Sequence, residues 1–165
     1  MAILTDSERR LLEHPDQAVM LAQVCAWSAI NSGSRNLAGL AAMAATLADA
    51  FAVLPGDLSL VDPAPVEAIN SDGSRSSIAH GQHLIVQVRP KAPIRMLFTG
   101  HMDTVFPIDH AFQSLRWLDD ATLNGPGVAD MKGGLSVMLA ALTAIEADPA
   151  SAAFGYDLVI NSDEE

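Results

Sequence analysis

The chain has 165 residues, of which 50% are hydrophobic, so it can bury an ordinary core and is expected to form one folded domain. Nine basic residues stand against twenty acidic ones, and the net charge of -11 repels the phosphates of nucleic acids and of anionic membranes. Polar residues interrupt every apolar run, so we see no export signal or membrane span and expect a soluble cytoplasmic protein that binds neither nucleic acid nor membrane.

The first half of the chain predicts two helices followed by short strands. A helix is expected at residues 16–30, with its valine, leucine and tryptophan side chains as core candidates, and an alanine-rich helix at 37–54. Short strands are expected at 58–61 and 66–69, followed by a turn at 71–73. Two helices joined by a polar loop therefore begin the domain.

The second half predicts the central part of a sheet. Strands at 83–89 and 94–99 surround a proline-containing turn and are expected to form a hairpin. A helix at 131–147 and a strand at 156–160 follow, and a strand, a helix and a strand in this order form a βαβ unit with a right-handed crossover. The expected fold is α/β, with a mixed, largely parallel sheet flanked by helices.

His101 and Asp103 follow the predicted strand 94–99. Residues two apart in an extended chain point to the same side, so these side chains are expected to share a face. A histidine that ligates a metal usually donates its second ring N–H to a carboxylate, which Asp103 can supply. Taken alone, His-x-Asp is more often a surface pair or a capped turn.

Asp130 stands between a Gly-Pro-Gly turn at 125–127 and the predicted helix 131–147. It either caps that helix or places its two carboxylate oxygens between two cations. A phosphate-binding Gly-x-Gly turn is a further interpretation, but Asp130 occupies the third glycine position of the dinucleotide pattern, and an acid repels pyrophosphate.

Asp163, Glu164 and Glu165 are three consecutive carboxylates after the predicted strand 156–160. Crowded carboxylates repel one another unless solvent or a cation lies between them. A solvated strand end accounts for the run. Two divalent ions account for it more specifically, with one glutamate as a ligand and its neighbour free to accept a proton from water.

Three segments resemble the N-terminal signatures of the M20 metallopeptidases. They lie at 99–107, 124–134 and 161–165 and read Thr-Gly-His-Met-Asp-Thr-Val-Phe-Pro, Asn-Gly-Pro-Gly-Val-Ala-Asp-Met-Lys-Gly-Gly and Asn-Ser-Asp-Glu-Glu. The last two look most similar to the glutamate carboxypeptidase branch of this family, which also includes acetylornithine deacetylase. The resemblance implies that residues 1–165 are the N-terminal part of a catalytic zinc-hydrolase domain, without its C-terminal part or the lid and dimerisation domain.

The resemblance also implies a role for each of five residues. His101 would ligate one zinc ion, and Asp103 would orient His101. Asp130 would bridge two zinc ions and precede an unusual cis peptide bond. Glu164 would be the general base, and Glu165 would ligate the other zinc ion. Co²⁺ or Mn²⁺ could substitute for Zn²⁺.

The implied function is that of a metallocarboxypeptidase or amidohydrolase. It would cleave an amide or peptide bond next to a free carboxylate, in a small peptide or an N-acyl amino acid, and would form a homodimer if a full-length protein exists. The alternative is an inactive truncated metal-binding or assembly module that lacks the remaining ligands. A nucleotide-binding βαβ domain is a third interpretation, which requires phosphate binding near residues 125–127.

Overall fold

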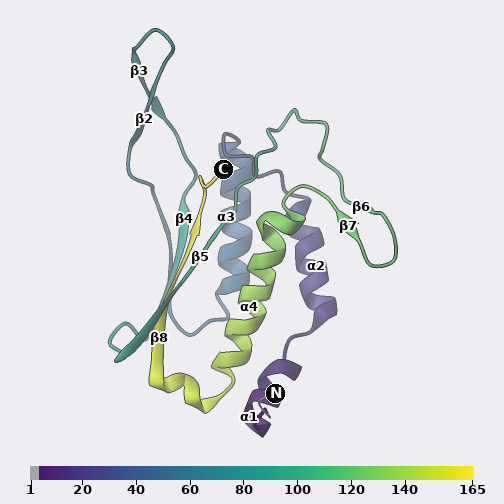
Figure 1. Ribbon diagram of the computed structural model, residues 1–165. Helices are drawn as coiled ribbons and strands as arrows, with labels where there is room; N and C mark the ends of the chain where they lie inside the picture. Colours follow the sequence, from purple (N-terminus) through teal and green to yellow (C-terminus); the bar gives the residue numbers. More distant parts are fainter. Residues whose placement is uncertain (1–3) are drawn as a thin grey trace.

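A four-stranded sheet covered on one face by helices forms the body of the molecule (Figure 1). The computed structural model describes residues 4–165. Its α-helices are α1 (Asp6–Glu13), α2 (Gln17–Ser28), α3 (Leu37–Phe51) and α4 (Gly133–Glu146). Its strands are β1 (Asp57–Val61), β2 (Val66–Ile69), β3 (Arg75–Ile78), β4 (His83–Val88), β5 (Ile94–His101), β6 (Arg116–Trp117), β7 (Leu123–Asn124) and β8 (Phe154–Asn161).

The main sheet has the strand order β1-β4-β8-β5. The sheet is mixed, as the sequence predicted, but fewer of its strand pairs are parallel than expected. Strands β5 and β8 are parallel, whereas β4 pairs antiparallel with both β1 and β8. Two short hairpins, β2–β3 and β6–β7, lie outside this sheet.

The predicted hairpin of residues 83–89 and 94–99 is wrong, because β8 lies between β4 and β5 and pairs with both. The side chains of Tyr156, Leu158 and Ile160 on β8 are fully buried. A strand this apolar buries more surface at the centre of a sheet than at its edge, so its position follows from the hydrophobic effect.

The core lies between the sheet and two helices. Apolar residues of α3 and α4 recur at the helical period and have at most 5% of their surface exposed. These residues are Leu40, Met43, Leu47 and Phe51 on α3, and Leu135, Leu139 and Leu142 on α4. Buried side chains of β4 and β8 complete this core. The site described below therefore rests on a packed two-layer support.

Helix α2 packs on α4 and on residues 128–132 rather than on the sheet. Its N-terminus is capped by Asp16, whose side chain accepts hydrogen bonds from two backbone amides. Trp27 is buried, but Val19 and Leu21 are 53% and 43% exposed. The core expectation is therefore wrong for these two residues, because α2 lies one layer further out.

The segment Val128–Glu146 is long and apolar enough, by length and composition alone, to cross a membrane. In this fold the leucines of α4 are buried in the core. A buried core helix has the same composition as a membrane span, so we interpret this segment as a core helix.

The Arg89 guanidinium joins the sheet to the end of α4. It donates hydrogen bonds to Glu146 at 2.9 and 2.5 Å and to the carbonyl oxygen of Phe154 at 2.6 Å. The pKa of Glu146 is lowered from its ordinary value of 4.5, chiefly by the hydrogen bonds from Arg89. The pair therefore stabilises the fold above pH 4.5, and this contribution is lost as the pH falls further.

Replacing Glu146 by Gln is expected to lower the free energy of unfolding by about 2 kcal/mol near neutral pH, because a bidentate, charge-assisted contact is lost. Urea unfolding followed by circular dichroism measures the effect. The difference between the two proteins should shrink below pH 4.5, where the wild-type carboxylate also takes up a proton.

Glu67→Gln provides the matched control. Glu67 pairs with Arg75 on the β2–β3 hairpin, and the two side chains are 58% and 71% exposed. This substitution is expected to change stability by less than about 0.5 kcal/mol. Equal losses in the two variants would contradict a structural role for the Arg89–Glu146 pair.

Candidate metal centre

The candidate site lies where β5 and β8 end. These strands are parallel neighbours, so their carboxyl ends meet at one edge of the sheet, where open α/β sheets place their ligands. His101 is the last residue of β5 and stands opposite Asn161 of β8. The amide of Met102 then donates to the carbonyl oxygen of Asn161 at 2.8 Å. Residues 103 and 163–165 are thereby brought together.

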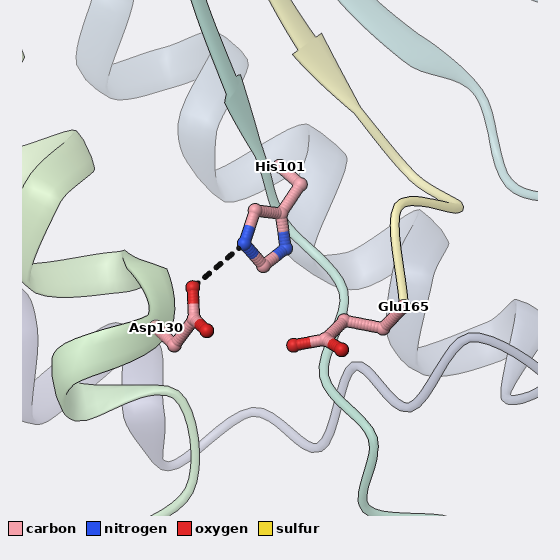
Figure 2. Close-up of side chains that lie close together, drawn as sticks. All are labelled: His101, Asp130 and Glu165. Carbon is pink, nitrogen blue, oxygen red and sulfur yellow. Dashed lines mark hydrogen bonds and ion pairs between the residues drawn. The ribbon is translucent and has the colours of Figure 1, made fainter.

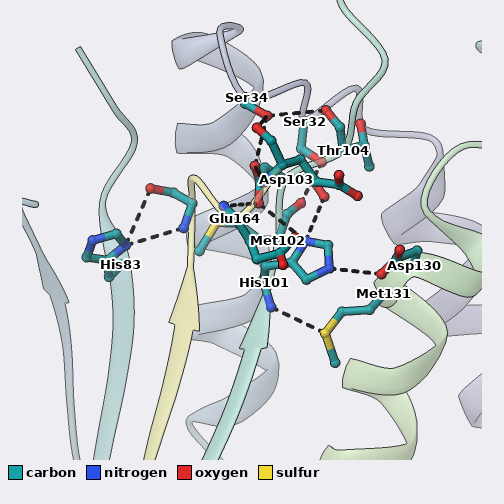
Figure 3. Close-up of polar contacts among 12 residues, drawn as sticks. Ser32, Ser34, His83, His101, Met102, Asp103, Thr104, Asp130, Met131 and Glu164 are labelled. Atoms are coloured by element: carbon teal, nitrogen blue, oxygen red, sulfur yellow. Dashed lines mark hydrogen bonds and ion pairs between the residues drawn. The ribbon is translucent and has the colours of Figure 1, made fainter. Parts of the chain in front are cut away.

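Asp103 is fully buried and connects the segments around it (Figure 3). Its carboxylate accepts hydrogen bonds from the backbone amides of Glu164 and Glu165 at 3.2 and 3.0 Å. The hydroxyl of Ser34 donates to the same carboxylate at 2.8 Å. A buried carboxylate is tolerated when donors surround it, so these contacts satisfy its oxygens and fix the chain segments that carry the donors.

The polar loop between α2 and α3 supports Asp103 from a second side. Gly33 forms a parallel bridge with Thr104, and the amide of Thr104 donates to the carbonyl oxygen of Ser32 at 3.0 Å. The Ser32 hydroxyl donates to the carbonyl oxygen of Met102 at 2.7 Å. The sequence showed this loop only as a polar break, so the role of Ser34 was missed.

His101 has both ring nitrogens next to acidic residues. Nδ1 lies 3.2 Å from the carbonyl oxygen of Asp103 and 3.3 Å from its Oδ1, and Nε2 lies 2.9 Å from Oδ1 of Asp130. Burial lowers the pKa of His101, but the hydrogen bond to Asp130 and the negative charges of Asp103, Asp130 and Glu164 raise it above its ordinary value overall. The surroundings of this imidazole therefore favour a positive charge.

Asp130 does not cap α4, which excludes the capping interpretation. The helix begins at Gly133, and its N-cap position is Lys132, which makes no side-chain capping bond. Asp130 has an extended backbone and is followed by a cis peptide bond to Met131, as the family resemblance implied. Its carboxylate is 77% exposed and contacts the buried ring of His101.

Lys132 supports the turn that presents Asp130. It is almost fully buried, and its ammonium group donates to the carbonyl oxygen of Ile30 at 2.9 Å. Burial lowers the pKa of Lys132 to about 8. Gly127 has a left-handed φ of 70°, and a side chain there would meet the Lys132 stem at 3.0 Å. Glycine at 127 therefore lets the turn lie directly on this lysine.

Three side chains form a group with the donor atoms of a metal site. The ligand atoms of His101, Asp130 and Glu165 all lie within 4.8 Å of one another (Figure 2). An imidazole with two carboxylates is a typical ligand set for zinc, and three protein ligands leave a position for water or substrate. Because His101 Nδ1 is held by Asp103, the remaining nitrogen, Nε2, faces the two carboxylates.

Glu164 is not one of these three residues. It is exposed, its amide is held by Asp103, and its negative charge is close enough to raise the pKa of His101. The structure therefore brings all five residues singled out in the sequence to one edge of the sheet. Their catalytic and metal-binding roles stay predictions.

A loop before β4 holds the backbone just ahead of Glu164. The buried hydroxyl of Ser162 donates to the carbonyl oxygen of Gly81 at 2.6 Å, and its amide donates to Nδ1 of His83 at 3.3 Å. His80, with a side chain 6% exposed, lies 3.2 Å from the carboxylate of Asp163. Asp163 thus points toward His80. The sequence carried no signal for this loop beyond its histidines.

Comparison with known proteins supports a peptidase relationship. Residues 97–165 match the model of peptidase family M20/M25/M40. No curated protein matches the chain.

Solved structures share the fold at low sequence identity. Human carnosine dipeptidase 1 is 23% identical with a TM-score of 0.71, over 99% of this chain and 35% of that chain. The dipeptidase Dug1p from Saccharomyces cerevisiae is 14% identical with a TM-score of 0.65, over 93% of this chain and 33% of that one. Porphyromonas gingivalis glutaminyl cyclase is 18% identical with a TM-score of 0.61, over 90% of this chain and 46% of that one. The chain thus spans between a third and a half of each of these relatives.

Asp103→Asn tests whether the buried carboxylate organises the site. The amide nitrogen of Asn would face at least one of the donors that now contact Asp103, so we expect a loss of about 2–3 kcal/mol in the free energy of unfolding. Hydrogen exchange at the amides of Glu164 and Glu165 should become faster, as measured by NMR.

The control is Asp109→Asn, since Asp109 is exposed on the neighbouring loop. It should leave both stability and exchange unchanged. Unchanged exchange at residues 164 and 165 in the Asp103 variant would show that these amides are not held by this carboxylate.

Proposed function

We propose that the chain carries part of the active site of a metallohydrolase that cleaves amide or peptide bonds, because residues 97–165 match the model of peptidase family M20/M25/M40. The observation that supports this most strongly is the group of His101, Asp130 and Glu165, whose ligand atoms lie within 4.8 Å of one another. Glutaminyl cyclases share the fold, so the family match rather than the fold favours hydrolysis.

The residues present fit a divalent cation. His101 would bind it through Nε2, and Asp130 and Glu165 through carboxylate oxygens, with Zn²⁺ as the preferred ion and Co²⁺ or Mn²⁺ as substitutes. Asp130 could serve two ions, because its carboxylate is exposed and has two oxygens, one of which now contacts the ring of His101. When bound, such ions polarise a carbonyl group and lower the pKa of water.

Glu164 is proposed as the general base. Its carboxylate is exposed and lies near His101, while its backbone is fixed by Asp103. It would take a proton from the attacking water and pass it to the leaving amine. Asp103 would keep the His101 ring in the orientation that leaves Nε2 available.

The second candidate is a metal-binding or assembly module without turnover. It is favoured by the ligand group itself, because His101, Asp130 and Glu165 can hold an ion without hydrolysing a substrate. The three ligand residues found here would then hold an ion, but the chain would not hydrolyse any substrate. Measurements of metal binding and of hydrolysis separate the two functions.

Asp130→Ala is expected to weaken Zn²⁺ binding by more than about 100-fold, because it removes one of three protein ligands. Isothermal titration calorimetry on the 165-residue chain measures the affinity. Asp109→Ala, on an exposed loop, should bind Zn²⁺ like the wild type. Equal affinity of both variants would show that Asp130 is not a ligand, and neither candidate function would then stand.

Glu164→Gln separates hydrolysis from metal binding. It keeps the size of the side chain and removes its ability to accept a proton, so hydrolysis of dipeptides and N-acetyl amino acids should fall by at least about 100-fold. Zn²⁺ affinity should change little. Zn²⁺ binding by the wild type without any release of amine would support the assembly module instead.

A further inference from the structure

We infer that the substrate of this site is an N-acylated amino acid or peptide whose C-terminal residue is apolar, with an aromatic side chain preferred. The inference rests on the proposed function, since it assigns the substrate groups that lie beside the proposed metal ligands. It follows from two cavities that adjoin Glu165 and Val105 and differ in character.

The first cavity has a volume of about 320 Å³ and opens beside the metal-ligand group. Its walls include Val105, Phe106 and Phe112, and the turn at 125–127 contributes glycine backbone. Asp130 and Glu165 also line it. A cavity of this size with apolar and aromatic walls is typical of a site for a small organic group, and it can hold a phenyl ring.

The aromatic wall is held in a defined position. Phe106 and Phe112 pack edge to face with ring centroids 4.9 Å apart. Asn31 donates to the carbonyl oxygen of Phe106 at 3.1 Å and to Gln113 at 2.8 Å, and Gln113 donates to the carbonyl oxygen of Pro107 at 2.9 Å. These contacts tie the loop to the polar segment that also supports Asp103, so the wall and the metal ligands form one unit.

Charge decides what kind of side chain the first cavity accepts. The described residues that line it include two carboxylates and no basic side chain. An acidic substrate side chain would lose its hydration there without gaining a basic partner from the described walls. An uncharged apolar side chain gains by burial against the aromatic wall.

The second cavity, of about 330 Å³, is also lined by Val105 and Glu165. It is lined by Ser34, Arg35, Thr104 and Pro107 as well. Arg35 is exposed and supplies the only positive charge among the described residues that line either cavity. A guanidinium binds a carboxylate in bidentate fashion, so Arg35 is placed to bind the free carboxylate of the same substrate residue.

Binding of N-acetyl-L-phenylalanine to the Zn²⁺-loaded chain tests the inference. We expect it to bind at least about tenfold more tightly than N-acetylglycine, because glycine leaves the first cavity empty. It should also bind at least about tenfold more tightly than N-acetyl-L-phenylalanine amide, which lacks the carboxylate. Ligand titrations followed by NMR give the three affinities.

Two variants assign each preference to its cavity. Phe112→Ala should abolish the preference for phenylalanine over glycine, and Arg35→Gln should abolish the preference for the acid over the amide. Val105→Trp serves the same purpose if Phe112→Ala does not fold. Val105 is exposed, so a tryptophan there fills the first cavity without removing a core contact, and the preference for phenylalanine over glycine should again be lost. Ile108→Ala, 70% exposed on the same loop, is the control that should change neither preference.

The outcomes distinguish this inference from the proposed function. Tight Zn²⁺ binding without any preference for phenylalanine, or with a preference that the Phe112 and Val105 variants leave unchanged, overturns the side-chain assignment alone. A preference for the acid that survives in Arg35→Gln overturns the carboxylate assignment. Failure to bind Zn²⁺ removes the proposed function, and the same titrations on the metal-free chain then decide whether the cavities bind these groups.

Discussion

The carboxylate of Asp103 joins three parts of the chain that are far apart in sequence. Its partners are the hydroxyl of Ser34, the ring of His101 and the backbone amides of Glu164 and Glu165. A carboxylate without exposure is costly unless donors surround it, so each of these contacts offsets part of the cost of burying Asp103. The bonds that satisfy Asp103 therefore also orient the imidazole and fix the backbone of both glutamates, which is the kind of support that a precise metal site requires.

The parallel pairing of β5 with β8 makes this arrangement available. In the register observed, His101 lies opposite Asn161, so the residues after both strands emerge at the same edge. The connection between the two strands carries Asp130 at the turn before α4. One βαβ unit thus supplies every member of the candidate ligand group. A register slip of one residue would turn His101 to the opposite face of the sheet, because side chains alternate along a strand.

Signals from residues close together in the sequence predicted the helices and the strand–helix–strand unit, whose formation depends mainly on neighbouring residues. The period of apolar residues and the cap at Asp16 located α2, and the order of strand, helix and strand around residues 131–147 predicted the pairing of β5 with β8. The proposed hairpin of residues 83–89 and 94–99 failed because a turn between two strands does not exclude a third strand from lying between them. That choice depends on how much apolar surface β8 buries, which is a property of the whole sheet.

For the site, too, the sequence indicated some residues and not others: it indicated the candidate ligands, but not the residues that hold them in place. His101, Asp103, Asp130 and Glu165 stood in short recognisable patterns, and the structure places them together. Their supports did not stand out, because polar loops have no period and each contact joins distant positions. Ser34 and Asp103 are 69 residues apart, and Ser162 and His83 are 79 residues apart. Such pairs become visible only when the fold is known.

The acidic residues of the site differ in their surroundings. Donors surround Asp103, whereas Asp130 is exposed and meets the ring of His101. Burial lowers the pKa of His101, but the hydrogen bond to Asp130 and the nearby negative charges hold it above its ordinary value overall. Because Arg35 is the single basic side chain among the described residues that line the two cavities, the proposed attraction of a substrate carboxylate depends on this guanidinium.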